Sequence, residues 1–318
     1  MSSLHLGILM DPIDHIKPFK DSTLAMMLAA RRRGWELHYM EGRDLRLEAG
    51  RTWARTRTLE VFDDADRWFL PGPEEDLPLD RLDLVLMRKD PPFDLEYLYL
   101  THLLESAEGR GLAVFNPPAA LRDANEKLFA LRWPELTPPN LVTCDLTRIK
   151  AFLSQQGDIV LKPLDAMGGA SVFRITASDP NLTVIWETLT QHGRRLVLAQ
   201  RFLPEVLEGG DRRILLIDGE PVPYALARMP PPGEIRANLA VGGRGHGVEL
   251  SDRDLAIAER IGPELRRRGI VFAGIDVIGG YLTEVNVTSP TCIRELDRAY
   301  GLDIAGRLLD CIERRLAP

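Results

Sequence analysis

Residues 269–287 read GIVFAGIDVIGGYLTEVNV, two apolar runs that meet at the pair Gly279-Gly280. Short runs rich in β-branched residues and joined by glycines predict a β-hairpin. On the second run Glu284 and Asn286 stand two residues apart, so their side chains share one face of the strand. Carboxylate and amide oxygens are the ligands that Mg²⁺ takes in proteins. The stretch therefore predicts a hairpin that carries metal ligands.

The register of this hairpin decides whether Asp276 joins them. A two-residue turn at the glycine pair would place Asp276 opposite Thr283 and turn it away from Glu284. A three-residue loop over residues 279–281 would place Asp276 opposite Glu284 instead. Such loops with glycine are common, so we predict this register and a magnesium site at Asp276, Glu284 and Asn286. The alternative is three solvated polar side chains on an open face.

Residues 158–174, DIVLKPLDAMGGASVFR, place Lys162 at the end of an apolar strand and before a glycine-rich turn. A lysine in this position has poor access to water and needs an anionic partner. The backbone N–H groups of residues 168–170 can cradle a phosphate while the lysine supplies charge. The alternative for this segment alone is a salt bridge beside an ordinary hairpin.

Residues 212–228, RRILLIDGEPVPYALAR, predict a second hairpin. The dipeptide Asp218-Gly219 favours a two-residue turn, which would place Arg213 opposite Tyr224 and Arg228 further along the same face. Two guanidinium groups on one face repel each other unless an anion lies between them, and arginine binds carboxylate and phosphoryl oxygens well. The alternative is that nearby acidic side chains pair with both arginines.

The N-terminal third alternates apolar strand signals with helical ones, which predicts a parallel sheet and an α/β fold. Ligands bind at the carboxyl ends of such strands, where Asp11 and the segment 88–90 lie. After Pro117-Pro118 the pattern changes to short strands and hairpins with helices between them. Residues 229–247, MPPPGEIRANLAVGGRGHG, lack periodicity and predict a lid or a disordered loop.

The composition is that of a globular protein with a mildly acidic balance. The chain has 318 residues, which suggests about two domains at roughly 150 residues each. Its 40 basic and 47 acidic side chains give a net charge of −7, which disfavours a nucleic-acid partner. No apolar run reaches the ~18 residues of a membrane span, and the first residues carry no basic leader, so we expect a cytoplasmic protein.

Several common catalytic patterns are absent from the sequence. It contains no GxxxxGK[ST], no GxGxxG after the first strand and no GxSxG, which argues against a P-loop, a dinucleotide fingerprint and a nucleophile elbow. Cys144, Cys292 and Cys311 are widely spaced, which argues against disulfides or a cysteine-rich zinc site. The six histidines are scattered along the chain, which weakens a hydrolase triad or a zinc enzyme.

Six segments resemble, in order, the prokaryotic glutathione synthetase family of the ATP-grasp superfamily. They are LGILMDPI (6–13), MRKDPPFD (87–94), NEKLF (125–129), LKPLDAMGGAS (161–171), DGEPVPY (218–224) and TEVNVTSPTCIRE (283–295). The second and the last are specific, whereas many ATP-grasp ligases share the lysine and glycine loop. The resemblance covers essentially the whole chain. It implies an N-terminal parallel-sheet domain over residues 1–122, followed by an ATP-grasp domain over 123–318 whose two α+β halves divide near residue 202.

The resemblance also implies roles for individual residues. The ATP-binding set would be Lys127, Lys162, Gly168, Gly169, Ala170, Ser171, Gln200, Phe202, Leu203 and Asp211. The metal ligands, for Mg²⁺ or Mn²⁺, would be Asp276, Glu284 and Asn286. Arg213 and Arg228 would face the reacting phosphoryl and carboxylate groups, and the peptide substrate would be held by Ser289, Pro290, Thr291 and Arg294. Residues 229–244 would form the lid.

The implied reaction joins γ-glutamylcysteine to glycine with ATP, through an acyl phosphate, in a homotetramer. The alternatives are another ATP-grasp peptide or amino-acid ligase, and a non-catalytic nucleotide-binding regulator. Such a regulator would be expected to have lost a metal ligand. Two features depart from the family pattern: Ala166 stands where glycine is usual, and three prolines, 230–232, begin the lid. An alanine would carry a cost if that position needed a positive φ.

Overall fold

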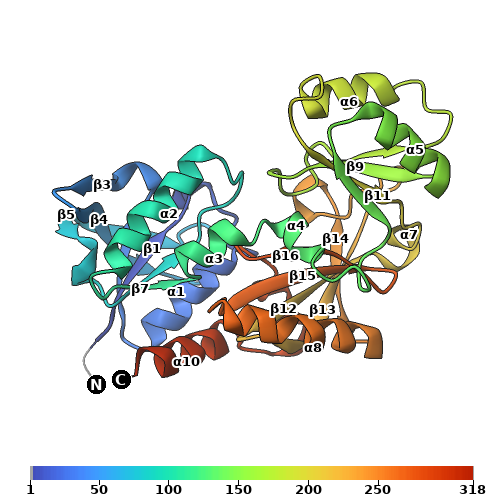
Figure 1. The fold of residues 1–318 in the computed structure, drawn as a ribbon. Coiled ribbons are helices and arrows are strands. Elements are labelled where there is room, and N and C mark those ends of the chain that lie inside the picture. Colours follow the sequence, from blue (N-terminus) through green and yellow to red (C-terminus); the bar gives the residue numbers. More distant parts are fainter. Residues whose placement is uncertain (1–2, 318) are drawn as a thin grey trace.

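The apolar runs of the N-terminal third form a seven-stranded sheet in the computed structural model, which describes residues 3–317 (Figure 1). Its strands β2, β1, β6 and β7 are parallel, as the alternation of strands and helices predicts. Parallel strands need cover on both faces, and β6 is buried along its whole length. The four strands are β1 (His5–Leu9), β2 (Glu36–Met40), β6 (Leu84–Met87) and β7 (Ala113–Phe115).

Three antiparallel strands that were not predicted from the sequence extend the parallel sheet. They are β3 (Leu45–Glu48), β4 (Arg51–Val61) and β5 (Phe69–Pro78), and β4 pairs antiparallel with β2. The side chains of β4 alternate between buried and exposed positions, the pattern of an antiparallel strand with one solvated face. The sheet is therefore mixed, with the antiparallel strands at one edge and the parallel strands β2, β1, β6 and β7 on the other side.

Helices cover both faces of the N-terminal sheet. On one side lies α1 (Ser22–Arg32), whose first turn is capped by Asp21 through a bond from the Leu24 N–H. The other side carries α2 (Leu95–Glu108), beside α3 (Pro118–Asp123). The C-terminal helices α9 (Ile293–Tyr300) and α10 (Ile304–Leu316) pack against α1. The two ends of the chain therefore share one hydrophobic core.

A small antiparallel sheet stands apart from the rest at the upper right of Figure 1. Its order is β10-β9-β11-β8, and the strands are β8 (Asn140–Thr143), β9 (Ile159–Pro163), β10 (Phe173–Ile175) and β11 (Val197–Arg201). Helices α5 (Leu146–Gln156) and α6 (Leu182–Thr190) bury one face in a core of its own. The face away from these helices is free to line a ligand site.

The third sheet is antiparallel, with the order β14-β13-β12-β15-β16. One of its faces packs on α8 (Asp252–Arg267) through residues such as Ile214 and Ile275. Because side chains alternate along a strand, Arg213 and Asp276 point to the opposite face. The strands are β12 (Asp211–Ile217), β13 (Glu220–Met229), β14 (Arg244–Glu249), β15 (Phe272–Ile278) and β16 (Tyr281–Asn286). Two short helices lie at its edges, α4 (Glu126–Ala130) and α7 (Val206–Gly209).

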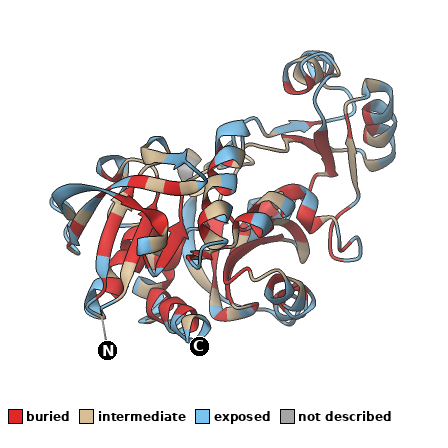
Figure 2. Cartoon of the chain, turned by 60° about the vertical axis from the view of Figure 1, so that its left-hand side comes forward, coloured by how far each residue is buried: buried red, intermediate tan, exposed pale blue. Residues whose placement is uncertain are grey.

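The three sheets support the division that we propose at residues 122 and 202, with one qualification. Helix α4 follows the first boundary but packs against β16 of the third sheet, so the central sheet proper begins at β8. Figure 2 shows buried residues on the interior strands and on the helix faces that pack against them, while outward-facing residues of both strands and helices are exposed. Within residues 3–317 we find no helix with both the length and the apolar composition that crossing a membrane requires.

Candidate active site

A cavity lies between the second and third sheets and is bordered by the loop that follows β13. Counted with its open mouth, its volume is about 780 Å³. Many predicted site residues line it: Lys127, Lys162, Gly168, Gly169, Ala170, Gln200, Phe202, Leu203, Asp211 and Glu284.

One wall of the cavity presents buried polar atoms from neighbouring strands. Lys162 on β9 donates from Nζ to Oε1 of Gln200 on β11, at 3.1 Å. Nε2 of Gln200 is buried and has no hydrogen-bond partner among the described residues. Burial lowers the pKa of Lys162, because the ammonium group loses its water. This wall therefore favours a ligand that brings both negative charge and a hydrogen-bond acceptor.

A second lysine reaches the cavity from α4. Asn125 caps this helix by accepting bonds from the N–H groups of Lys127 and Leu128, which fixes where the side chain of Lys127 starts. Its Nζ donates to the carbonyl oxygen of Ala166 at 2.6 Å and lies 3.7 Å from Oε1 of Glu284. Lys127 thus connects the glycine-rich loop to the hairpin that carries the predicted metal ligands.

The glycine-rich loop needs its glycines for backbone reasons. Gly168 and Gly169 have φ values of 65° and 79°, which side chains with a Cβ rarely adopt. A Cβ on Gly169 would also lie 2.6 Å from Oδ1 of Asn238 in the loop after β13. Ala166 is not among the residues with positive φ, so alanine carries no backbone cost there, and only its carbonyl oxygen is used by Lys127.

The hairpin predicted over residues 269–287 forms as β15 and β16, and Asp276 lies opposite Glu284. The predicted three-residue loop is nevertheless wrong, because the turn has two residues, Gly279-Gly280. The pairing skips Thr283 on β16, and this bulge shifts the register by one residue. A bulge changes the direction of the side chains beyond it. Asp276, Glu284 and Asn286 therefore share one face of the sheet, as predicted.

The second hairpin also differs from the prediction in register but not in face. Arg213 lies opposite Leu226, two residues from the predicted partner Tyr224. A shift of two residues preserves the face, so Arg213 and Arg228 do point the same way. The anion between them is the carboxylate of Asp276, which accepts from Arg213 and lies 2.9 Å from Nη2 of Arg228. The pairing of these arginines with an acidic side chain, given above as the alternative, is what forms.

These charges are almost completely buried. The side chains of Arg213, Arg228 and Asp276 are 7%, 4% and 2% exposed. Burial alone would raise the pKa of Asp276, but the two guanidinium groups outweigh it and hold this pKa well below its ordinary value. Arg228 also binds Oδ2 of Asp211, whose other oxygen, Oδ1, is buried without a hydrogen-bond partner among the described residues.

The predicted metal ligands have the right atoms for a hard cation. Glu284 lines the cavity with a partly exposed side chain. Asn286 donates from Nδ2 to the carbonyl of Gly274 and to Oδ2 of Asp276, which leaves its amide oxygen for a cation. Oδ2 of Asp276 is used by three donors, whereas Oδ1 accepts from Arg213 alone. The fit to magnesium therefore rests first on Glu284 and Asn286, with one atom of Asp276 in addition.

The segment 289–291 lies where the third sheet meets the carboxyl ends of the N-terminal parallel strands. Arg88, which follows β6, donates from Nη2 to the carbonyl oxygen of Pro290 at 3.0 Å, and the side chain of Ser289 lies near the carboxyl group of Asp90. Gly274 lies between Pro290 and the side chain of Arg213, because a Cβ added to this glycine would contact both. The segment is thus close to the buried arginines.

Nine predicted site residues do not line the cavity: Ser171, Arg213, Arg228, Asp276, Asn286, Ser289, Pro290, Thr291 and Arg294. Arg294 pairs with Asp63 and borders a separate surface hollow between α1 and α9. Ser171 adopts a φ of 57° at the end of the glycine-rich loop but does not line the cavity.

The apolar walls of the cavity, and the buried Glu126 that holds α4 in place, were not predicted from the sequence. The missed wall residues include Val160, Val172, Val206 and Ile278, whereas residues 235–238, which also line the cavity, belong to the predicted lid. Val160 stands two residues before Lys162 on the same strand, so strand periodicity could have found it. Glu126 accepts, at Oε1, bonds from the backbone N–H groups of Val287 and Thr288 and from the threonine hydroxyl. It fixes α4 against the end of β16.

Known proteins of similar sequence match along nearly the whole chain. The family model described as prokaryotic glutathione synthetase, N-terminal domain, matches residues 4–122, and the model of the family's ATP-grasp domain matches residues 126–301. A glutathione synthetase of Pseudomonas syringae pv. tomato is 58% identical over 314 residues, which cover 99% of this chain and 98% of that protein. The glutathione synthetases of Pseudomonas aeruginosa and Shewanella oneidensis are each 56% identical, over 99% and 98% of this chain and 99% of each relative.

Solved structures of low sequence identity share the fold. The D-cycloserine synthetase DcsG superposes with a TM-score of 0.71 at 15% identity and covers 98% of this chain and 99% of its own. D-alanyl-alanine synthetase A from Vibrio cholerae gives a TM-score of 0.61 at 14% identity, with full coverage of both chains. These likenesses support an ATP-grasp architecture, and the sequence matches define the group within it. The chain belongs to the prokaryotic glutathione synthetase family.

Proposed function

We propose that this chain is an ATP-dependent ligase that joins the cysteinyl carboxylate of γ-glutamylcysteine to the amine of glycine. The observation that carries the proposal is the convergence, in one cavity, of Lys127, Lys162 and Glu284 beside a glycine-rich loop. The relatives that are 54–58% identical over the whole chain are all glutathione synthetases, which favours these substrates over those of other ATP-grasp ligases.

The chemistry explains why such a cavity is needed. A carboxylate is a poor electrophile at neutral pH, so its oxygen first attacks the γ-phosphorus of ATP, and ADP leaves. The glycine amine then attacks the carbonyl carbon of the acyl phosphate, phosphate leaves, and the amine loses a proton. Both steps gather anionic oxygens at one place, which requires cations fixed in advance. Arg213 and Arg228, held by Asp276, supply such fixed charge below the cavity.

The charge balance supports a role for magnesium as well. Bound Mg²⁺ would neutralise phosphate charge and polarise the phosphoryl oxygen. Two lysines and two arginines oppose three carboxylates here, an excess of one positive charge against the roughly four negative charges of ATP. The groups counted are Lys127, Lys162, Arg213, Arg228, Asp211, Asp276 and Glu284.

The loop after β13 is suited to exclude water from the acyl phosphate. Residues 235–238 already line the cavity and touch the glycine-rich loop at Gly169. The irregular stretch is shorter than the sequence predicts, because β14 begins at Arg244. A short lid that closes on a phosphate loop protects a water-sensitive intermediate.

The direct test is an ADP-release assay with ATP, Mg²⁺, γ-glutamylcysteine and glycine, in which the product is identified by mass. We expect ADP and glutathione in equal amounts, and little ADP when glycine is left out. D-alanine or glutamate in place of the two substrates serves as the comparison. ADP release with those amino acids, but not with γ-glutamylcysteine, would assign the chain to a different ligase. No ADP release with any of them would favour a non-catalytic nucleotide-binding regulator.

Lys162→Met tests the phosphate-binding role of the lysine. A hydrogen bond to a charged group is worth about 1.5–3 kcal/mol, so we expect the KM for ATP to rise roughly 10–100-fold. The free variant should be at least as stable as the wild type, because the variant no longer buries an ammonium group whose pKa is lowered. Steady-state kinetics and thermal unfolding measure the two effects. The exposed Lys150→Met on α5 is the control, and an unchanged KM in Lys162→Met would contradict the role.

Gly169→Ala tests the contact between the glycine-rich loop and the lid. The new Cβ would lie 2.6 Å from Oδ1 of Asn238, at a φ of 79°. Gly157→Ala is a matched control, since its φ is 81° but nothing lies within 4 Å of a Cβ there. Both variants should lose about 1 kcal/mol of stability, whereas only Gly169→Ala should raise the KM for ATP, by roughly tenfold. Equal kinetics in the two variants would show that the contact has no role.

The homotetramer implied by the family resemblance stays a prediction. Sedimentation analysis of the purified chain would test it.

A further inference from the structure

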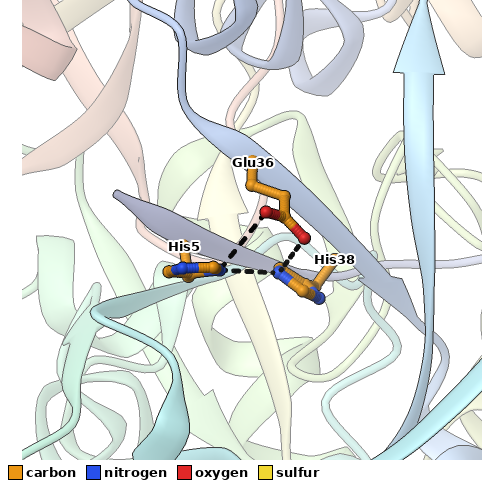
Figure 3. Close-up of side chains that lie close together, drawn as sticks. All are labelled: His5, Glu36 and His38. Carbon is orange, nitrogen blue, oxygen red and sulfur yellow. Dashed lines mark hydrogen bonds and ion pairs between the residues drawn. The ribbon is translucent and has the colours of Figure 1, made fainter. Parts of the chain in front are cut away.

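Three side chains that the proposed reaction does not use meet at the amino ends of β1 and β2 (Figure 3). His5 begins β1 and lies beside Glu36 on the parallel strand β2, and His38 follows two residues later on the same face. Nδ1 of His5 lies 3.1 Å from Nε2 of His38. Oxygens of the Glu36 carboxylate lie 3.7 Å from the first of these nitrogens and 3.3 Å from the second. Three electron-pair donors therefore point at one place.

Hydrogen bonding among the three groups cannot satisfy all of them. Each neutral imidazole has one proton for its two nitrogens, so at most two of the three contacts hold a proton. His38 is only 4% exposed, and its second nitrogen, Nδ1, has no partner among the described residues. A cation among the three atoms would use every converging lone pair.

Two of the distances match edges of a tetrahedron of ligand atoms around zinc. Zinc binds imidazole nitrogen at about 2.0–2.1 Å and carboxylate oxygen at about 2.0–2.2 Å. The ligand atoms of a regular tetrahedron of that size lie about 3.3–3.5 Å apart. The separation of the two imidazole nitrogens, 3.1 Å, and that of Nε2 of His38 from Oε1 of Glu36, 3.3 Å, are close to this value. Nδ1 of His5 lies 3.7 Å from the other carboxylate oxygen, Oε2, and one ligand atom from each of the three residues lies within 4.8 Å of the other two. Two imidazoles and one carboxylate suit zinc and related transition ions, whereas magnesium and calcium take oxygen ligands.

We propose that His5, Glu36 and His38 form a Zn²⁺ site with three protein ligands and a water molecule in the fourth position. The site is separate from the proposed active site, because that site meets the carboxyl ends of the parallel strands, where Asp11 and Lys89 pair. A metal here ties the first residue of β1 to β2. It acts on the stability of the N-terminal sheet and leaves the ligation chemistry alone.

The test is calorimetric titration of the whole protein with Zn²⁺ in excess Mg²⁺, which occupies the oxygen-rich active site. His5→Asn and His38→Asn should each bind zinc at this site at least about 100-fold more weakly, since altering even an outer-shell partner costs 10–100-fold. The matched control is His102→Asn on α2, whose histidine lies 3.7 Å from Glu105 with no third ligand nearby. This control should bind as the wild type does. With Co²⁺ as the probe, the wild type and the control should give the strong visible absorption of a tetrahedral ion.

Zinc should also raise the melting temperature of the wild type and of His102→Asn but not of the two ligand variants. His5 is about half exposed, so His5→Asn keeps the fold even if the buried His38 does not tolerate replacement. Equal zinc affinity in wild type and His5→Asn would overturn the three-ligand site. An octahedral Co²⁺ spectrum, or loss of binding in His102→Asn to the same extent, would overturn it as well.

Discussion

Glu284→Gln is expected to lower kcat for glutathione formation by roughly 10²–10³-fold, because a neutral amide replaces the carboxylate that we propose as a metal ligand and that faces the cavity. The substitution keeps the shape of the side chain, so the fold and the bulge at Thr283 should persist. The charge that Lys127 faces at 3.7 Å is also lost. The measurement is ADP release at several magnesium concentrations. Raising the concentration should recover part of the rate, since a weakened site fills at higher metal.

Glu249→Gln is the matched control for this experiment. Glu249 lies on β14 of the same sheet, is exposed and does not line the cavity. We expect its kcat and its magnesium dependence to equal those of the wild type. A wild-type kcat in Glu284→Gln would show that Glu284 is not a metal ligand. The nucleotide-binding role of Lys162 is tested separately, by Lys162→Met.

Arg228→Ala is expected to abolish ligation and to cost about 3–5 kcal/mol of folding stability, since it leaves the buried carboxylate of Asp211 without its ion-pair partner and leaves Asp276 with Arg213 alone. Arg228→Lys separates the two effects. Lysine keeps the positive charge but cannot bind two carboxylates with a planar fork. We expect it to fold, to bind ATP nearly as well as the wild type, and to lose roughly 10²-fold in kcat.

Arg212→Lys is the matched control, because Arg212 is the neighbour on β12 that points to the opposite face and pairs with Asp254 of α8. It should retain full activity. The rates are measured as single-turnover ADP release, ATP binding by calorimetry and stability by thermal unfolding. If Arg228→Lys turned over at the wild-type rate, the arginine would be a structural counter-ion for Asp276 and would have no part in the reaction.

Local patterns determined which residues share a face. Glu284 and Asn286 stand two apart on one strand, and Arg213 and Arg228 lie on one face although the predicted partner across the hairpin was two residues off. A register error of two residues leaves each side chain on the predicted face, because the side-chain period of a strand is two. For the same reason Lys162 was placed correctly at the end of its strand, and Val160 could have been.

Tertiary structure decided what those faces meet. The bulge at Thr283 shifts the hairpin by one residue, and a one-residue shift, unlike one of two, exchanges the faces. Neither hairpin alone reveals that Asp276 lies between the two arginines, because the contact joins strands more than 60 residues apart. His5 and His38, 33 residues apart, likewise meet only because β1 and β2 pair in parallel.

The sequence by itself determined the α/β organisation, the family and most residues of the cavity, because strand periodicity, capping and turn residues act over a few neighbours. It did not determine the register of either hairpin, the ion pairs of the buried arginines or the position of Arg294 beside Asp63. These depend on packing between distant segments, where burial makes one arrangement of charges far more favourable than the others.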